Sequence, residues 1–248
     1  MNVVADGALA NGNAQNSVHL IVSDAEGNRV PNVRVSLQAT NQAIVAESVL
    51  TDSNGEATVL VTSIRAGSSS LTATVGDSNR RADINFVSDS STAHIADADL
   101  SVLPKISIAD GKMLKAIRTQ VIDTQLNLVD NIAVGFSADN GAVVEASSVN
   151  TDAQGIVETT LLSTMAGISR VSAEVNQQRT MKETVFIGNN ASAQVVAVTP
   201  ASGPYIADGR TPVLFSAKVE DSNGNLLFNV AVDWHSDRDS NQVRFSQR

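Results

Sequence analysis

The three histidines are the side chains best suited to acid–base chemistry, because an unperturbed imidazole titrates near neutral pH. His19 alternates with apolar residues in a strand-like run, His94 lies in a polar stretch, and His235 directly follows Trp234. Hydrolytic catalysis needs a nucleophile, a base and an orienting group within hydrogen-bonding reach of one another. The sequence offers no such set, so we interpret each histidine as structural and predict that the chain is not an enzyme.

Aspartates near two of the histidines could bind a hard cation such as Ca²⁺, which prefers oxygen ligands. The candidates are Asp97 and Asp99 after His94, and Asp233, Asp237 and Asp239 around His235. The first pair supplies too few ligands unless Asp89 or a carbonyl joins it, and the second spacing matches no calcium loop that we can name. We therefore expect exposed loops at both places, with no metal and no cofactor.

Composition and motifs argue against several other functions. The net charge of −9 and the lack of a basic stripe argue against nucleic acid, because phosphate binding relies on clustered Lys and Arg. There is no P-loop, HExxH or Gly-rich dinucleotide motif, and an aromatic content of 3% weakens a carbohydrate-binding interpretation. There is no cysteine, no apolar run of about 20 residues and no signal peptide, so we expect any membrane anchor to lie outside this chain.

The elements that hold these residues follow an internal repeat, which fixes the architecture. Three Asp-x-x-x-Asn segments begin at Asp24, Asp123 and Asp221, at offsets of 99 and 98 residues. A Gly twelve residues before each Asp ends an Ala-x-Gly segment, which we interpret only as the turn that enters the second strand of each module. A second Asn four residues after each first Asn keeps the same register. These landmarks are Gly12, Asn28 and Asn32, then Gly111, Asn127 and Asn131, then Gly209, Asn225 and Asn229.

The second half of the repeat occurs twice, at an offset of 100 residues. Its landmarks are Asp52, Gly55 and Gly67 in the first copy and Asp152, Gly155 and Gly167 in the second. We expect each Asp to accept a hydrogen bond from the backbone two residues on, while Gly supplies the positive φ that closes the turn. Leu126 stands where the other Asp-x-x-x-Asn segments have Gly, so we expect a strained or differently typed turn there.

Between the landmarks, apolar residues alternate with polar ones, which is the period of half-buried β-strands. Turn residues separate these runs about every 8–12 residues, as in an all-β sandwich. The second Asn of each repeat opens one such run. Trp234 occupies the same repeat position as Leu37 and Phe136, which predicts a core side chain.

These patterns predict an all-β protein of tandem immunoglobulin-like β-sandwich domains arranged as an elongated rod. We divide the chain into module 1 (residues 1–93), module 2 (residues 94–191) and module 3 (residues 192–248), the last one truncated at its carboxy-terminal side. Short polar linkers at residues 88–96 and 188–193 join them, which leaves limited room for swing.

The order of the landmarks resembles the bacterial immunoglobulin-like group 1 repeat of the intimin and invasin adhesins. That order runs Ala-Asp-Gly, a strand, Asp-x-x-Gly-Asn, Asn-x-x-Val, Thr-Asp-x-x-Gly with an alternating strand, and Ala-Gly, and it covers nearly the whole chain. The resemblance implies the extracellular portion of an outer-membrane protein on a Gram-negative cell surface, held by a β-barrel domain outside this chain. The family's tip has no counterpart here, so the ligand-binding residues are unknown.

We therefore expect a monomeric stalk segment of a surface adhesin, which projects a host-binding tip or contributes to binding a host-cell receptor or matrix protein. One alternative is homotypic contact between cells, through exposed sheet edges that pair between copies. Another alternative is an accessory Ig-like array of a secreted carbohydrate-active enzyme. A concentration-dependent mass would indicate the first alternative, and a catalytic domain in the flanking sequence would indicate the second.

Overall fold

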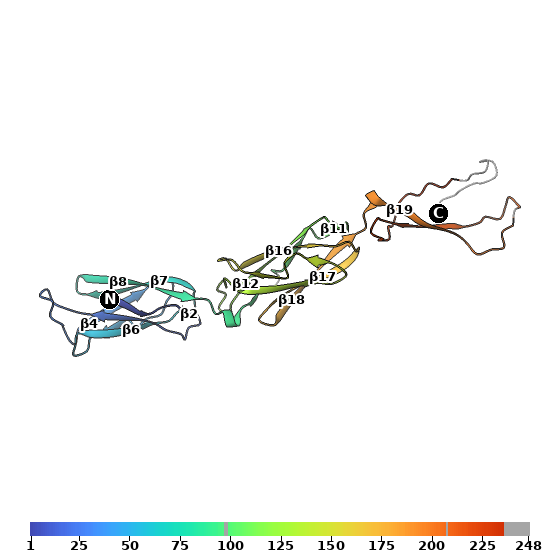
Figure 1. Ribbon diagram of the computed structural model, residues 1–248. Coiled ribbons are helices and arrows are strands. Elements are labelled where there is room, and N and C mark those ends of the chain that lie inside the picture. The colour runs from blue at the N-terminus through green and yellow to red at the C-terminus, as the bar shows by residue number, and fades with distance from the viewer. Residues whose placement is uncertain (97–98, 207, 236–248) are drawn as a thin grey trace.

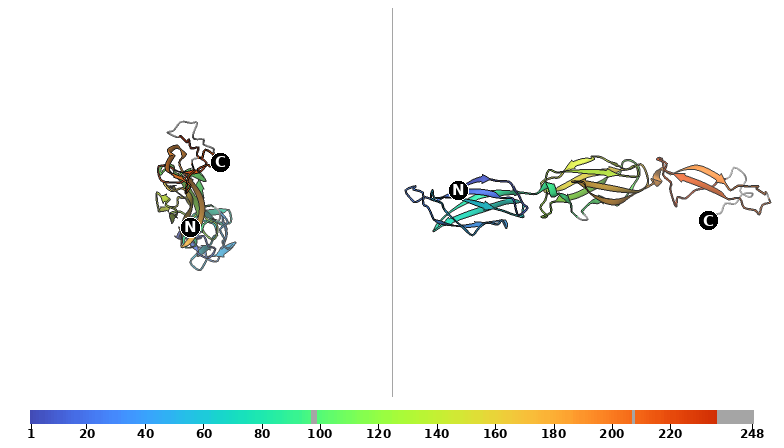
Figure 2. Two further views of the ribbon diagram at one scale, coloured as in Figure 1. Left: turned by 90° about the vertical axis from the view of Figure 1, so that its right-hand side faces the viewer. Right: turned by 90° about the horizontal axis from the view of Figure 1, so that it is seen from below.

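The computed structural model describes residues 1–96, 99–206 and 208–235, and apart from two 3₁₀ turns the regular secondary structure of these residues is β-strand. Three units follow one another along one long axis, and the amino-terminus lies in the first of them (Figure 1). A view from below shows the same extended arrangement (Figure 2). The predicted all-β rod of Ig-like modules is confirmed. No helix within the described ranges is long and apolar enough to cross a membrane.

Module 1 is a sandwich of two sheets. Its strands are β1 (Asn2–Ala5), β2 (Ala8–Leu9), β3 (Asn16–Ile21), β4 (Arg34–Ala39), β5 (Ser48–Leu50), β6 (Glu56–Val61), β7 (Gly67–Val75) and β8 (Ser78–Val87). One sheet has the order β1-β3-β6 and the other the order β2-β8-β7-β4-β5. The short strand β2 runs parallel to β8, whereas the other pairs are antiparallel.

Module 2 repeats this plan. The linker before it contains the 3₁₀ turn η1 (Ser90–Thr92). The module's strands are β9 (His94–Ile95), β10 (Ser101–Leu103), β11 (Ile106–Ile108), β12 (Lys115–Ile122), β13 (Ala133–Ala138), β14 (Val143–Val144), β15 (Ser148–Asn150), β16 (Ile156–Leu162), β17 (Gly167–Val175) and β18 (Gln178–Ile187). The sheets have the orders β10-β12-β16-β14, with β9 also paired to β12, and β11-β18-β17-β13-β15. The parallel pair here is β11 with β18.

Each complete module has its own core, built from the alternating apolar residues of both sheets. In β3, Val18 and Leu20 are buried, while His19 between them is half-buried. Phe86 and Phe186 occupy equivalent core positions in the two modules. Ala93, the last residue of the predicted first module, packs in the core of the second, because η1 turns the chain into it.

Lys115 is an unexpected member of the second core. Its side chain is fully buried, its Nζ donates to the Pro104 carbonyl at 2.6 Å, and it lies 4.8 Å from the centre of the Phe186 ring. Burial lowers the pKa of this ammonium group, because removal from water penalises its charged form. The equivalent position of module 1 is Asn16, which is also buried and bonds to two backbone groups.

After the 3₁₀ turn η2 (Asn190–Ser192) in the linker, the described residues of module 3 form two antiparallel strands, β19 (Gln194–Pro200) and β20 (Phe215–Glu220). The strand-like run after Asn229 is not a strand in the described residues. The equivalent strands β4 and β13 pair with β7 and β17, and no described segment supplies that partner here. Trp234 is half-buried rather than in a closed core, and its ring centre lies 6.4 Å from that of Phe215.

Two expectations about turns need correction. Asn32 and Asn131 do not open strands; they have φ values of 56° and 51°, a left-handed conformation that a strand residue cannot adopt. Each stands two residues before its strand. The Ala-x-Gly turn leads into β3 rather than into the second strand, because the short strands β1 and β2 precede it.

Candidate functional site: the joints between modules

The Asp-x-x-x-Asn turn of module 2 is the centre of the first joint. Asp123 Oδ1 accepts hydrogen bonds from the backbone amides of Gln125 and Asn127, at 2.8 and 2.9 Å. Its Oδ2 accepts the Asn127 side-chain amide at 3.0 Å and the backbone amide of Asp89, in the linker, also at 3.0 Å. One buried carboxylate thus holds the turn, orients Asn127 and ties the linker to the module.

The Asn127 side chain bridges the two modules. Its Oδ1 accepts the backbone amide of Ala66 at 2.8 Å, and its Nδ2 donates to the carbonyl of Ile64 at 3.1 Å. Both partners belong to module 1. We call this pair of bonds the Asn clasp. Because the amide uses its acceptor and its donor on one loop, the clasp fixes the orientation of that loop as well as its distance.

The loop that receives the clasp, residues 63–66, is held in shape by hydrogen bonds within module 1. The buried Ser63 hydroxyl accepts the Arg65 amide and donates to the Arg65 carbonyl, both at 2.9 Å. The Gly12 amide donates to the Ser63 carbonyl at 2.9 Å. A Cβ at Gly12 would stand 3.2 Å from the Ile64 side chain, so the landmark glycine lets the two loops pack closely.

The second joint uses the same atoms in the same roles. Asn225 Oδ1 accepts the Ala166 amide at 2.7 Å, and its Nδ2 donates to the Thr164 carbonyl at 2.9 Å. Ser163 bonds both backbone groups of Met165, as Ser63 does those of Arg65. Two joints with one geometry indicate a repeated device rather than an accidental contact.

Module 3 adds one further bond to the second joint. The Asn223 side chain donates to the Ala109 carbonyl at 2.9 Å. Ala109 precedes Asp110 and Gly111, so the Ala-Asp-Gly landmark of module 2 also lies at this joint. We expected that motif to be only a turn.

Each linker is itself a capped turn. Asp89 accepts the Ser91 amide at 3.0 Å, and Asn189 accepts the Ala191 amide at 3.0 Å, which caps the 3₁₀ turns η1 and η2. The polar stretch between sandwiches therefore has a defined shape. A linker in a fixed turn and a clasp on a second loop give each joint two separate points of attachment.

The carboxylate of the second joint is charged at neutral pH. Burial raises the pKa of Asp221, but hydrogen bonds from the Asn189 backbone, the Asn225 side chain and the turn amides outweigh this effect. The pKa is therefore lowered from its usual 3.8, since these bonds favour the ionised form. The Asn189 amide donates to Oδ2 at 2.9 Å, just as the Asp89 amide does in the first joint.

Leu126 confirms the expected strain in the turn of module 2. Its φ is +65°, close to the left-handed values of +88° at Gly27 and +82° at Gly224. The turn type is unchanged, because the Leu126 amide donates to the Asp123 carbonyl at 3.0 Å as the glycine amides do in the other copies. A branched side chain in this region costs about 1–2 kcal/mol, which the surrounding bonds must offset.

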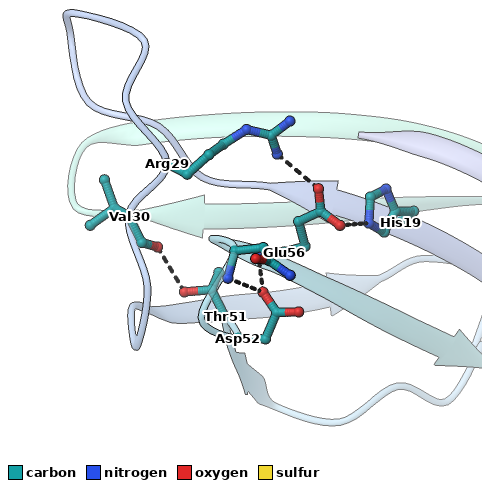
Figure 3. Close-up of polar contacts among 7 residues, drawn as sticks. His19, Arg29, Val30, Thr51, Asp52 and Glu56 are labelled. Carbon is teal, nitrogen blue, oxygen red and sulfur yellow. Dashed lines mark hydrogen bonds and ion pairs between the residues drawn. The ribbon is translucent and has the colours of Figure 1, made fainter.

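The Thr-Asp-x-x-Gly landmarks serve the interior of each module instead of a joint. Asp52 accepts the Glu56 amide at 2.9 Å, and the buried Thr51 hydroxyl donates to the Val30 carbonyl at 2.9 Å (Figure 3). Asp152 and Thr151 make the equivalent bonds in module 2. As expected, the turn leads directly into the next strand.

Within the residues that the structure describes, the histidines are not assembled into a reactive group. His19 Nε2 lies 3.2 Å from a Glu56 carboxylate that also accepts from Arg29 at 3.1 Å, on the surface of module 1 (Figure 3). Such exposed pairs contribute about 0–1 kcal/mol. His94 lies in β9 and contacts the Thr92 carbonyl at 3.1 Å, rather than in an irregular linker.

The aspartate groups do not form a metal site in the described part of the chain. There, no three His, Cys, Asp or Glu side chains come close enough to hold a metal ion. Asp99 and Asp233 are exposed. Asp97, Asp237 and Asp239 lie outside the described residues, so their proposed involvement is not tested.

Residues 1–87 and 97–187 match the family described as bacterial Ig-like domain (group 1). The chain belongs to this family. It is 29% identical over 229 residues to the inverse autotransporter adhesin YeeJ of Escherichia coli strain K12, a match that covers 90% of this chain and 10% of YeeJ. The chain therefore spans about a tenth of that relative's length. The predicted resemblance to intimin and invasin repeats is confirmed.

The solved structure of InvD shows the same fold. InvD of Yersinia pseudotuberculosis superposes with a TM-score of 0.69 at 17% identity, over 91% of this chain and 70% of InvD. The D0–D1 domains of intimin match at 26% identity over 75% of this chain and 96% of theirs, with a TM-score of 0.36. The matched family is one of bacterial Ig-like domains, and the matched curated relative is an adhesin.

Sequence reasoning found the Asp and Asn landmarks but missed their partners. Ser63 and Ser163 recur at an offset of 100 residues, and Asp89 and Asn189 precede equivalent turns, so the repeat register could have found all four. The pairing of Asn127 with residues 64 and 66 had no signal in the sequence, because it joins positions 61 and 63 residues apart across two modules.

Proposed function

We propose that this chain is a stalk segment of a Gram-negative surface adhesin that keeps consecutive Ig-like modules extended and so projects the rest of the protein from the cell. The observation that carries the proposal is the Asn clasp, which recurs at both joints with the same atoms. A projecting stalk needs stiff joints, and a clasp with a tied linker supplies them.

The energy of a clasp is adequate for this role. A neutral hydrogen bond contributes about 0.5–1.5 kcal/mol net, so two bonds contribute about 1–3 kcal/mol. That energy favours the docked over the undocked joint by roughly 5- to 150-fold. The bonds to Asp123 and Asp221 add to this preference, because they are charge-assisted.

The partner of the whole adhesin is proposed to be a host-cell receptor or matrix protein. Among the relatives, invasin is an integrin-binding protein, and a carboxy-terminal fragment of intimin binds the translocated intimin receptor. In our proposal this segment is monomeric and projects the rest of the adhesin from the cell.

Small-angle X-ray scattering of the purified chain at several concentrations tests the stalk. We expect a monomeric mass and a constant maximum dimension on the order of 100 Å, from strand lengths of about 3.3 Å per residue. A mass that rises with concentration would favour homotypic contact instead. A broad range of bent shapes would contradict a stiff stalk.

A binding assay distinguishes a segment that only projects the adhesin from one that itself binds host cells or matrix proteins. The same chain is added to epithelial cells and to immobilised matrix proteins over a range of concentrations. A stalk segment shows no saturable binding, whereas saturable binding would assign the modules a binding face of their own.

A further inference from the structure

The Asp-x-x-x-Asn turn of module 1 has the same internal geometry as the two turns that make joints. Asp24 Oδ1 accepts the Glu26 and Asn28 amides at 3.1 and 2.8 Å, and its Oδ2 accepts the Asn28 side-chain amide at 3.0 Å. The Asp24 amide donates to the Asn28 carbonyl at 3.0 Å, as at Asp123 and Asp221. The side chain of Asn28 is thus oriented like those of Asn127 and Asn225.

The outward groups of this turn are free in the described part of the chain. Within that part, no hydrogen bond from another module reaches the Asn28 side chain, and no linker amide reaches Asp24. Asp24 and Asn28 are exposed, whereas Asp123 and Asp221 are buried in their joints. Hydrogen bonds from the Asn28 side chain and backbone lower the pKa of Asp24, so its acceptor is ionised at neutral pH.

We propose that the Asp24–Asn28 turn is a docking site for the Ser-x-x-Ala loop of another module of this family, placed on the amino-terminal side of module 1. The chemistry of the site defines that occupant. Asn28 needs one backbone amide and, two residues earlier, one carbonyl, held in a fixed loop. Asp24 Oδ2 needs one linker amide.

The loops that the chain itself contains are already occupied. Residues 63–66 receive Asn127, and residues 163–166 receive Asn225. Neither loop can bind Asn28 of a second copy of the chain unless its own joint opens. The occupant is therefore a further module with a free loop, and the proposal goes beyond the stalk role by naming what this surface binds.

A duplicated chain tests the proposal. Residues 1–99 are repeated before residue 1, which reproduces the 99-residue register of the first joint and places a copy of the linker ahead of module 1. Spin labels on the added module and on modules 1 and 2 report the distance distribution across the new joint and across the first joint, by pulsed electron paramagnetic resonance.

We expect the distance distribution across the new joint to be as narrow as that across the first joint. Asn28→Ala in the original module 1 should broaden the distance distribution across the new joint at least twofold and leave that across the first joint unchanged. Asn127→Ala should broaden the distribution across the first joint and leave that across the new joint unchanged. A cooperative urea unfolding transition of the Asn28→Ala variant confirms that the module remains folded.

The outcomes distinguish this proposal from the stalk role. A broad distance distribution across the new joint that Asn28→Ala does not change, together with a narrow distribution across the first joint, contradicts the docking site. That result would leave the proposed stalk role unaffected. If both joints are broad, the clasp does not stiffen the chain, and both proposals fail.

Discussion

At the scale of single residues, Asn28 and Asn127 provide a natural comparison. Both lie in the same turn, and both bond to the Asp four residues before them. Only Asn127 also bonds to another module. Its role therefore comes from its surroundings, since the local sequence and the local geometry are shared.

Replacing Asn127 with Ala removes both bonds of the clasp. We expect the coupling between modules 1 and 2 to weaken by about 1–3 kcal/mol, because two neutral hydrogen bonds are lost. Spin-label distances across the first joint should broaden. Asn28→Ala is the matched control, since it loses the same bonds within its turn and none between modules. Equal broadening by both variants would contradict the assignment.

The pH dependence of the second joint follows from Asp221. Its pKa is lowered in the folded protein, so the stabilisation is fully present above the usual value of 3.8 and is lost as the pH falls through the lowered pKa. The backbone amide of Asn189 and the side-chain amide of Asn225 should report this transition in NMR spectra recorded from pH 7 downward. A midpoint at or above 3.8 would contradict the lowered pKa.

At the scale of elements, tight turns connect consecutive strands and leave little space for additional side-chain atoms. Gly55 stands between the Thr51–Asp52 corner and β6, with φ +72°. A Cβ there would lie 2.9 Å from the Val30 backbone nitrogen and 3.0 Å from the Val22 carbonyl oxygen. The backbone conformation and the packing both require glycine at this position.

Gly55→Ala should lower the free energy of unfolding of module 1 by about 2–4 kcal/mol, from left-handed strain together with overpacking. Gly7→Ala is the control, because Gly7 has φ +75° but nothing within 4 Å of the added Cβ. Only the strain applies there, so we expect a loss of about 1 kcal/mol. Urea unfolding measures both, and similar losses would show that packing at Gly55 has no effect.

At the scale of the whole molecule, the two complete modules have separate cores, and no apolar cluster of described residues spans the joint. The joint is held by polar groups and a capped linker instead. The modules can therefore unfold separately under force while remaining aligned at rest. This combination suits a chain that carries tension, because one module can unfold without exposing the core of the next.

Single-molecule stretching should show two separate unfolding events, one from each complete module. Each event should release on the order of 300 Å of chain, because about 90 residues extend by about 3.3–3.6 Å each. Asn127→Ala should leave the two lengths unchanged, since the cores stay intact. One event of twice that length would mean that the modules unfold as a single unit.

The repeat, the turn chemistry and the alternation of apolar residues were readable from the sequence, because each depends on positions that are close together in the chain. They determined the Ig-like fold, the strained turn at Leu126 and the positions of Asp24, Asp123 and Asp221. The tertiary structure decided which of these turns forms a joint, because the clasp of Asn127 depends on a loop 61 residues away. It also decided the burial of Lys115 and the half-buried position of Trp234, since the exposure of a side chain depends on which segments pack over it.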